Sequence, residues 1–375
     1  MSGDEGHPEP DRVEGAPHPR DTARLLGQSR AEGAFLDAYA TGRLHHGWLI
    51  TGPRGVGKAT LAWRIARFLI ATPEAEEDGL FGAPPPPASL DIDPQHPVAR
   101  RMAALAEPRL QLTRRPYDEK ANRLKQDITV EEIRKLKSFF QLSSADGGRR
   151  VAIVDCADEM NTSAANALLK LLEEPPAGCT ILLIAHQPAR LLPTIRSRCR
   201  ELRLTTLDAA DMAEALVAAG AQPEDPVALA ALSGGSVGEA IRLVNLDGLK
   251  SYGRLVDLFS TLPRLDRPRA LALAEASTGR GNEAKFDLML GLMDLFLSRL
   301  ARTGVMGPPQ PEAAPGEAAL MARLCPDMGR ARKWAALHQS LGARAGHGQA
   351  VNLDPAALVM DMVLEISAVA EGAAA

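Results

Sequence analysis

The chain has 375 residues, a formal net charge of −4, 24% charged residues and 45% hydrophobic residues. This length and balance predict two or three domains of ordinary globular composition. No overall basic field indicates nucleic acid, so any DNA contact would be local or shared with partners. No apolar run reaches the ~18–20 residues that span a bilayer, and the acidic, proline-rich N-terminus lacks a secretory pattern. We therefore expect a cytoplasmic protein with no membrane partner.

The four cysteines are widely spaced and form no C-x-x-C pair. This spacing predicts neither a disulfide framework nor a zinc site. Residues 1–21 are rich in Gly, Pro, Glu and Asp, which predicts a disordered tail. A helix is predicted over residues 30–40, at the start of a nucleotide-binding core that we place at 22–205.

A glycine-rich turn follows the first predicted strand. Residues 48–50 form this short apolar strand, residues 52–58 match the phosphate-binding pattern G-x-x-x-x-G-K, and an amphipathic helix is predicted from there to about Ala71. Glycines let backbone N–H groups curl around an anion, the helix N-terminus adds its positive dipole end, and a lysine adds charge for the outer phosphates. A plain glycine turn before a helix is the alternative, but the strand and helix on either side favour nucleotide binding. The predicted binding residues of this loop are Gly52, Gly55, Gly57 and Lys58.

The position after the lysine departs from the pattern, which normally continues with Ser or Thr to help hold Mg²⁺. Ala59 stands there and Thr60 follows one residue later. One residue turns a helical side chain by ~100°, so Thr60 does not simply replace the missing ligand. Thr60 stays a candidate nucleotide-site residue, and Mg²⁺ binding stays open. The loop is thus predicted to hold a nucleotide and to be poorly suited to cleaving one.

The middle of the chain alternates apolar strands with helices. An acidic and proline-rich stretch at 72–97 is predicted to be a flexible insert. Beyond it, helices are predicted at 128–140 and 162–174, and strands at 110–113, 150–155, 180–185 and 202–204. This alternation predicts an α/β fold with a parallel sheet covered on both faces, and nucleotides bind at the carboxyl ends of such strands.

Asp155 ends one of these strands, downstream of the glycine loop. The metal-organising carboxylate of phosphoryl-transfer enzymes lies at this place, so Asp155 is a candidate nucleotide-site residue, although a surface carboxylate is the simpler alternative. In hydrolytic members of this class the next residue is usually Glu, which positions water. Here it is Cys156, and a thiol is no ionised carboxylate near neutral pH. Ala59 and Cys156 both weaken hydrolysis while leaving binding intact.

The strand pattern ends near Thr205, and the rest of the chain is predicted to be helical. Short helices are predicted at 208–219, 226–232 and 237–244, which form a small module at 206–247. Residues 248–375 form an all-helical domain with apolar stripes at helical spacing. One of these stripes could extend into a subunit interface, because oligomer contacts reuse core chemistry.

The segment 191–199 is unusually basic for a stretch attached to a sheet. An arginine placed in trans on a neighbour's nucleotide accelerates phosphoryl transfer by ~10³–10⁵-fold, because it stabilises charge in the transition state. A solvated basic turn is the alternative, and spacing alone does not choose between them.

Two motifs carry a family resemblance: Leu-Lys-Leu-Leu-Glu-Glu-Pro-Pro at 169–176 and the Ser-Arg-Cys that ends at 199. Together with the Leu-His-His-Gly-Trp segment at 44–48, the glycine loop and Asn-Leu-Asp-Pro at 352–355, they resemble the bacterial clamp-loader subunits of the AAA+ class. The resemblance covers nearly the whole chain, apart from the N-terminal tail and the insert.

The resemblance implies an AAA+ domain, a helical lid at 206–247 and a helical collar domain at 248–375. It also implies a component of the DNA polymerase III holoenzyme, placed with gamma/tau-like and delta-like subunits in a hetero-pentameric ring. Such a ring uses ATP to load a sliding clamp on primed DNA. By resemblance, Arg198 of the Ser-Arg-Cys motif is the trans arginine finger, the one catalytic residue expected here.

Further departures from the motor subunits follow from the same resemblance. Their lid arginine is missing, since Gly238 stands at its place after Gly-Ser-Val, and no cysteine precedes Cys156 where they carry a zinc module. We therefore expect no zinc, no independent ATPase activity, and binding of ATP or ADP as an open possibility. A self-sufficient gamma/tau-like motor is one alternative. A small-molecule kinase is another, but no acceptor-binding cluster is evident.

Overall fold

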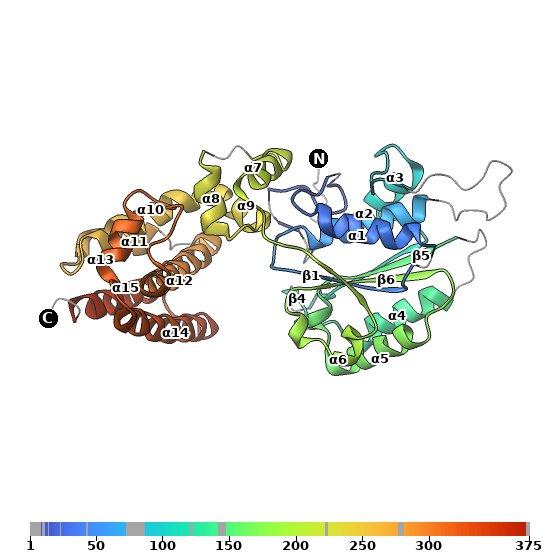
Figure 1. Ribbon diagram of the computed structural model, residues 1–375. Coiled ribbons are helices and arrows are strands. Elements are labelled where there is room, and N and C mark those ends of the chain that lie inside the picture. Colours follow the sequence, from blue (N-terminus) through green and yellow to red (C-terminus); the bar gives the residue numbers. More distant parts are fainter. Residues whose placement is uncertain are drawn as a thin grey trace, which may run out of the picture. The chain divides into compact units, whose positions relative to one another are not determined.

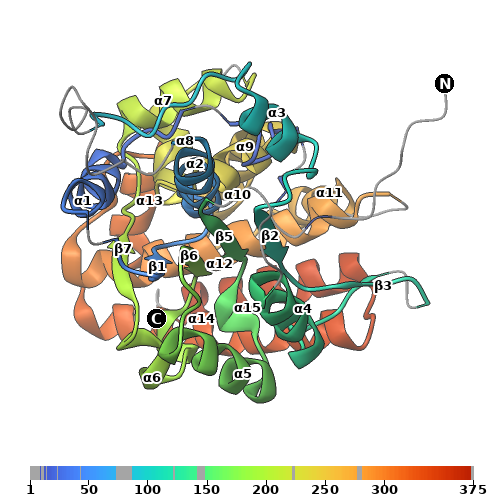
Figure 2. The same ribbon diagram turned by 90° about the vertical axis from the view of Figure 1, so that its right-hand side faces the viewer.

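The structure is a computed structural model, and it describes Glu9 and residues 12–13, 15–22, 24–42, 44–72, 87–120, 123–141, 148–221, 224–276 and 281–372. The chain forms two compact units. The first comprises residues 1–220 with 236–238, and the second comprises 221–235 with 239–375. Each unit is described by itself (Figures 1 and 2).

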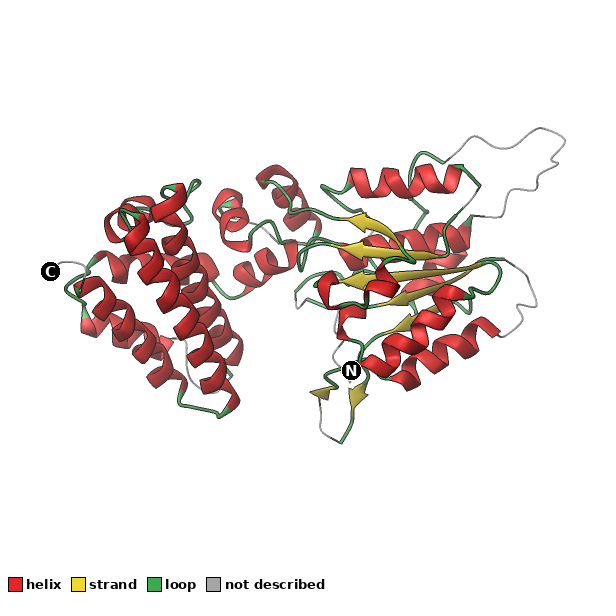
Figure 3. Ribbon diagram, turned by 60° about the horizontal axis from the view of Figure 1, so that its bottom comes forward, coloured by secondary structure: helices red, strands yellow, loops and turns green. Residues whose placement is uncertain are grey.

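The centre of the first unit is a five-stranded sheet in the order β2-β5-β6-β1-β7, and every neighbouring pair is parallel. Its strands are short apolar runs, as predicted, because strands covered on both faces lack polar alternation. Figure 3 shows them in yellow between helices. Their bounds are β1 Gly47–Thr51, β2 Leu110–Thr113, β5 Arg150–Val154, β6 Cys179–Ala185 and β7 Arg200–Arg203.

Helices cover both faces of this sheet, which confirms the predicted α/β architecture. In Figure 1, α1, α2 and α3 lie on one face, and α4, α5 and α6 on the other. Their bounds are α1 Ser29–Ala40, α2 Lys58–Ala71, α3 Pro97–Ala103, α4 Val130–Gln141, α5 Thr162–Glu173, α6 Pro193–Arg196 and, after the last strand, α7 Ala209–Ala218. Short elements complete the unit: the antiparallel pair β3 Tyr117–Asp118 and β4 Arg123–Leu124, and the 3₁₀ turns Ala157–Glu159 and Pro188–Arg190.

Alternate side chains of the strands enter two apolar cores. Leu49, Ile181 and Leu183 pack with the helices α4 and α5. On the other face Trp48 packs against Phe35 of α1, with ring centroids 5.0 Å apart. All five residues of β1 are therefore buried, and β1 leads directly into the glycine loop.

The second unit is helical, as predicted for the C-terminal region. Its longest helices, α12 and α14, pack side by side, and the Asp354 carboxylate caps α15 by accepting from Ala357 N at 2.9 Å. The bounds are α8 Pro226–Ser233, α9 Val237–Asn245, α10 Gly248–Ser260, α11 Arg267–Ala276, α12 Glu283–Met306, α13 Glu317–Leu324, α14 Met328–Ala350 and α15 Pro355–Glu371. A buried carboxylate ties three of these elements together: Glu317 accepts from Tyr252 at 2.6 Å and from Arg299 at 2.7 Å.

The described chain groups into two units where the sequence predicts a core, a lid and a collar. Helix α7 belongs to the first unit, and α8 and most of α9 to the second. Most of the predicted insert, 73–86, lies outside the described residues. Within the predicted tail, described residues contact the core: buried His18 packs edge-on to Trp63, and Glu9 pairs with Arg114 at 3.0 Å. At these residues the chain is part of the first unit.

Among the helices that the structure describes, no single one is long and apolar enough to cross a membrane, and the bent pair α8–α9 meets that test by length and composition only.

Candidate phosphate-binding loop and surface arginine

The glycine loop joins the end of β1 to the start of α2, as predicted. Its three glycines all have positive φ, at 142° for Gly52, 71° for Gly55 and 97° for Gly57. A Cβ at Gly52 would lie 2.7 Å from the Leu204 carbonyl oxygen. Glycine is therefore required here both for backbone conformation and for close approach.

Other segments of the first unit pack closely around this loop. A Cβ at Gly55 would overlap the Ser236 hydroxyl, and one at Gly57 would overlap the Leu25 side chain. Gly238 N also donates to Gly55 O at 3.2 Å. The loop is thus held from outside by segments that precede α1 and follow α8.

Lys58 is the first residue of α2, and its ammonium folds back onto the loop. Nζ donates to Gly52 O at 2.7 Å and to Pro53 O. The side chain is only 3% exposed, and this burial lowers the pKa of Lys58 to about 8. Neighbouring acidic groups oppose that shift, so the lysine stands beside the carboxylates that follow β5.

Asp155 directly follows β5 and is buried, with its backbone N donating to Thr113 O at 2.8 Å. Since β1, β6 and β5 are adjacent and parallel, their carboxyl ends meet at one edge. The structure therefore brings Asp155 and Lys58 to the same edge, as the sequence predicts.

Cys156 occupies the place of the expected glutamate. It is a non-glycine residue at φ 60°, and its Sγ lies 3.3 Å from Nε2 of His186, the residue after β6. Burial raises the pKa of the Cys156 thiol, and burial with the nearby Lys58 charge lowers the pKa of His186 to about 4. Both groups are therefore uncharged at neutral pH, and the site holds no carboxylate at this position.

Sequence reasoning missed His186, and it placed Asp158 and Glu159 past the strand end as residues that do not replace the expected glutamate. Asp158 caps the end of β6 by accepting from His186 N at 3.1 Å and Gln187 N at 2.8 Å. Glu159 pairs with Arg115 at 2.8 Å and Arg54 at 3.5 Å. Both carboxylates are committed to structural contacts, and no sequence signal marks their partners, which come from other loops.

The loop fits a phosphate group, because three glycines with positive φ and the N-terminus of α2 form the cradle that such an anion requires. The backbone of residues 55–58 and the Lys58 ammonium would hold it. The fit to Mg²⁺ is poorer. Ala59 offers no hydroxyl, and Thr60 is buried on α2 with no hydrogen bond from its hydroxyl among the described residues. The structure thus brings Thr60 into the helix beside the loop without giving it a ligand position.

Arg198 follows the short helix α6 and lies at the amino ends of the strands, opposite to the end that carries the glycine loop. Its side chain is 37% exposed, and its guanidinium donates to Thr194 O at 3.0 Å and pairs with Glu173 at 3.0 Å. A Cβ at Gly47, the first residue of β1, would lie 3.2 Å from Arg198 O. The arginine therefore stands at the amino end of the strand whose carboxyl end feeds the glycine loop.

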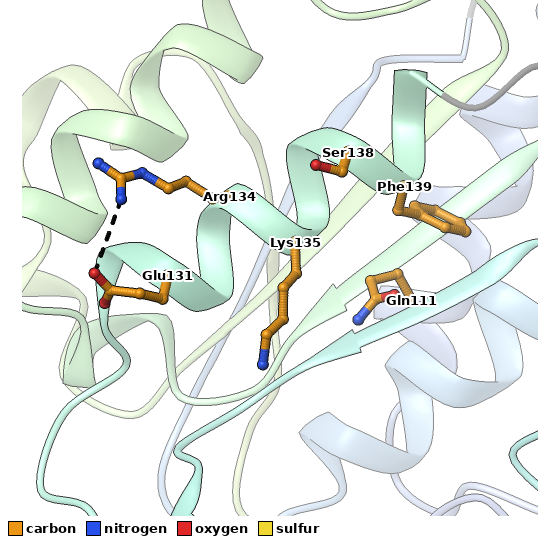
Figure 4. Close-up of a pocket in the computed structure, with 6 residues that line it drawn as sticks. All are labelled: Gln111, Glu131, Arg134, Lys135, Ser138 and Phe139. Atoms are coloured by element: carbon orange, nitrogen blue, oxygen red, sulfur yellow. Dashed lines mark ion pairs between the residues drawn. The ribbon is translucent and has the colours of Figure 1, made fainter.

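A shallow depression between β2 and α4 is separate from both places. Figure 4 shows Gln111 on the strand and Phe139 on the helix, with Glu131 and Arg134 pointing toward one another as an ion pair of 3.9 Å. It contains no glycine loop, and the first turn of α4 brings the Glu131 carboxylate there, which would repel a phosphate. In the part of the chain that the structure describes, no group of three or more His, Cys, Asp and Glu side chains could hold a metal ion.

Comparison with known proteins places these features in a family. The model of the family described as "DNA polymerase III, delta subunit" matches residues 27–208. The delta' subunit of DNA polymerase III from Pseudomonas aeruginosa is 37% identical over 202 residues, 53% of this chain and 55% of that protein. The delta' subunit from Yersinia pestis is 31% identical over 252 residues, 63% of this chain and 68% of that protein.

The tau subunit from Salmonella typhimurium is 29% identical over 279 residues, 72% of this chain and 40% of that protein. The chain therefore spans only part of most of these relatives. It covers 55% of the Pseudomonas delta' subunit and 40% of the tau subunit, against 68% of the Yersinia delta' subunit. Among solved structures, a gamma subunit-related protein from Thermotoga maritima is 17% identical, with a TM-score of 0.39 over 89% of this chain and 98% of that one. The sequence comparisons establish that the chain belongs to the DNA polymerase III clamp-loader family.

Proposed function

We propose that this chain is a non-motor clamp-loader subunit that binds ATP or ADP without cleaving it. In this proposal it supplies Arg198 as a trans arginine finger to the ATP site of a neighbouring subunit. Its partners are gamma/tau-like and delta-like subunits in a hetero-pentamer that loads a sliding clamp on primed DNA. It works as a component of the DNA polymerase III holoenzyme, in the cytoplasm.

One observation carries the trans assignment. Arg198 and the glycine loop stand at opposite ends of β1, which has five residues. Such a strand is about 16 Å long at ~3.3 Å per residue, too far for an arginine side chain to reach the loop of its own chain. A surface guanidinium that cannot serve its own site remains available to a site on another subunit.

The glycine loop of this chain supports the other part of the proposal, that the chain binds a nucleotide without cleaving it. The glycines and Lys58 supply phosphate contacts, whereas Ala59, Cys156 and Gly238 each lack a group that hydrolysis uses. The Cys156–His186 pair is uncharged near pH 7 and cannot replace a carboxylate that orients water.

A self-sufficient gamma/tau-like motor is the alternative, and tau and gamma subunits are among the relatives. It would require all three departures to be compensated by other residues. Independent ATP turnover by the purified chain would favour this alternative.

The test of the arginine finger is Arg198→Ala in the reconstituted clamp loader, with Arg196→Ala as the matched control. Arg196 is exposed two residues earlier and makes no ion pair in the described part of the chain. We expect Arg198→Ala to leave folding and assembly intact and to slow ATP cleavage at the neighbouring site by about 10³-fold. Equal rates for the two variants would show that Arg198 is no finger.

A further inference from the structure

Glu173 makes the ion pair that holds Arg198. It is the last residue of α5, and its Oε1 lies 3.0 Å from a terminal guanidinium nitrogen of Arg198. The two side chains are 43% and 37% exposed, so the pair lies at the surface, where a neighbouring subunit could approach it.

A second contact holds the same guanidinium from another direction. The other terminal nitrogen donates to Thr194 O, at 3.0 Å, within the α6 segment. An arginine has five N–H donors, and these two contacts leave further donors for an anion. Two acceptors therefore orient the guanidinium, and N–H donors remain available to bind an anion.

The end of α5 is itself firmly placed. Nε2 of His46 lies 2.9 Å from Leu172 O, and Pro175 and Pro176 end the helix just beyond Glu173. Leu172, Arg198 and Cys199 surround Gly47 closely enough that a Cβ there would lie 3.0–3.3 Å from each. The carboxylate thus projects from a fixed helix end that is packed against the backbone of the arginine segment.

The electrostatics explain why this pair is mutually favourable. The C-terminus of a helix carries partial negative charge, so a carboxylate at the last residue of α5 is unfavourable there by itself. A guanidinium offsets that repulsion and is attracted by the helix end as well. Without Glu173, the long arginine side chain would sample more rotamers before reaching a phosphate.

We propose that Glu173 is the positioning residue for Arg198. It restricts the guanidinium to one outward conformation, from which the remaining N–H donors meet the terminal phosphate of a nucleotide bound to the neighbouring subunit. This inference rests on the proposed trans function of Arg198. Glu173 itself does not touch the nucleotide.

A double-mutant cycle tests the proposal in the complete reconstituted clamp loader, with clamp, primed DNA and ATP. The variants are Glu173→Gln, Arg198→Ala and the two combined. Glu174→Gln is the matched control, because this adjacent exposed carboxylate makes no ion pair with any described residue. Glu173→Gln keeps the side-chain shape and removes the charge.

We expect Glu173→Gln to lower kcat about three- to fivefold, the effect of a well-placed exposed ion pair, with an unchanged KM for ATP and unchanged thermal unfolding. Glu174→Gln should have no effect. In the Arg198→Ala background, Glu173→Gln should cause no further loss, because the residue acts only through the arginine.

The outcomes separate the two proposals. If Arg198→Ala is inactive and Glu173→Gln matches the wild type, or exceeds it, the positioning proposal is wrong while the finger assignment stands. An equal loss from Glu173→Gln in both backgrounds would show a structural effect independent of Arg198, which also overturns the inference. If Arg198→Ala itself has no effect, the proposed function fails first.

Discussion

The two ends of β1 differ in how their charged groups are satisfied. At the carboxyl end, Lys58 is buried and bonded to carbonyl oxygens of its own loop. At the amino end, Arg198 is a partly exposed cation held by one carboxylate and one carbonyl. One strand thus separates an inward-facing cation from an outward-facing one.

In the proposed function, this difference separates nucleotide binding from catalysis. The phosphate cradle depends on backbone conformation, which the glycines preserve, whereas cleavage depends on particular side chains, which Ala59, Cys156 and Gly238 replace. The proposed catalytic residue, Arg198, lies at the other end of β1, where only another protomer can use it. Each prediction below tests one end of this comparison.

The largest expected effect concerns the packing of the glycine loop. Gly55→Ala places a Cβ against Ser236 at φ 71°, while Gly42→Ala has φ 69° and open space around it. Both should lose about 1–2 kcal/mol from the strained backbone. Gly55→Ala should lose about 1–3 kcal/mol more from overpacking, together with nucleotide binding. Chemical denaturation and nucleotide titration of the two variants measure the difference, and equal losses would contradict the close packing.

The next effect is a pH dependence of the free energy of unfolding, which arises from His186 near the glycine loop. The pKa of His186 is lowered from 6.5 to about 4, so the unfolded chain binds more protons between these values. The contribution of His186 to the free energy of unfolding should therefore be fully present above pH 6.5 and be lost as the pH approaches 4, by about 1–2 kcal/mol once solvent screening of this partly exposed ring is taken into account. His186→Gln keeps an acceptor near Cys156 and should remove this part of the loss. Parallel acid profiles for the wild type and the variant would exclude His186 as the cause.

Lys58→Ala compares the two cations directly. If the glycine loop of this chain binds ATP or ADP without cleaving ATP, removing Lys58 should weaken nucleotide binding by the isolated chain. The ATPase rate of the reconstituted complex should then fall by about fivefold or less. The loss from Arg198→Ala should be far larger, because only that arginine meets a transition state. An equal or greater loss from Lys58→Ala would mean that the own site is active.

The smallest effect is expected at the start of β1. A Cβ on Gly47 would lie 3.0 Å from Leu172 Cδ2 and 3.2 Å from Arg198 O, so Gly47→Ala should shift the arginine segment by a few tenths of an ångström. We expect a loss of about two- to threefold in ATPase of the complex, because small misplacements of positioned groups slow catalysis. Unchanged nucleotide binding by the isolated chain is the control. A normal ATPase rate would show that the segment adapts freely.

The sequence predicted the sheet and the loop well, because both depend on local patterns. Apolar runs mark β1, β5 and β6, and the glycine spacing marks the phosphate loop. The contact of Cys156 with His186 could not be predicted, since it joins residues 30 positions apart through the strand order. The Glu173–Arg198 ion pair could not be predicted for the same reason, although each residue belongs to a motif that the sequence marks.

The helical unit shows a different limit. Helix α14 continues through Gly342, Gly346 and Gly348, which individually disfavour a helix. Packing against α12 overrides that local preference, and packing cannot be read from one segment alone. The prediction of a disordered tail over residues 1–21 likewise did not include the burial of His18, which depends on the distant Trp63.

The division of labour between the two ends of β1 is tested most directly by nucleotide binding and turnover. The purified chain is measured alone, and then mixed with the motor subunit as wild type or as Arg198→Ala. We predict that the chain alone binds ATP or ADP without measurable turnover, and that only the wild type stimulates ATP cleavage in the mixture. Rapid turnover by the chain alone, or equal stimulation by Arg198→Ala, would contradict the account.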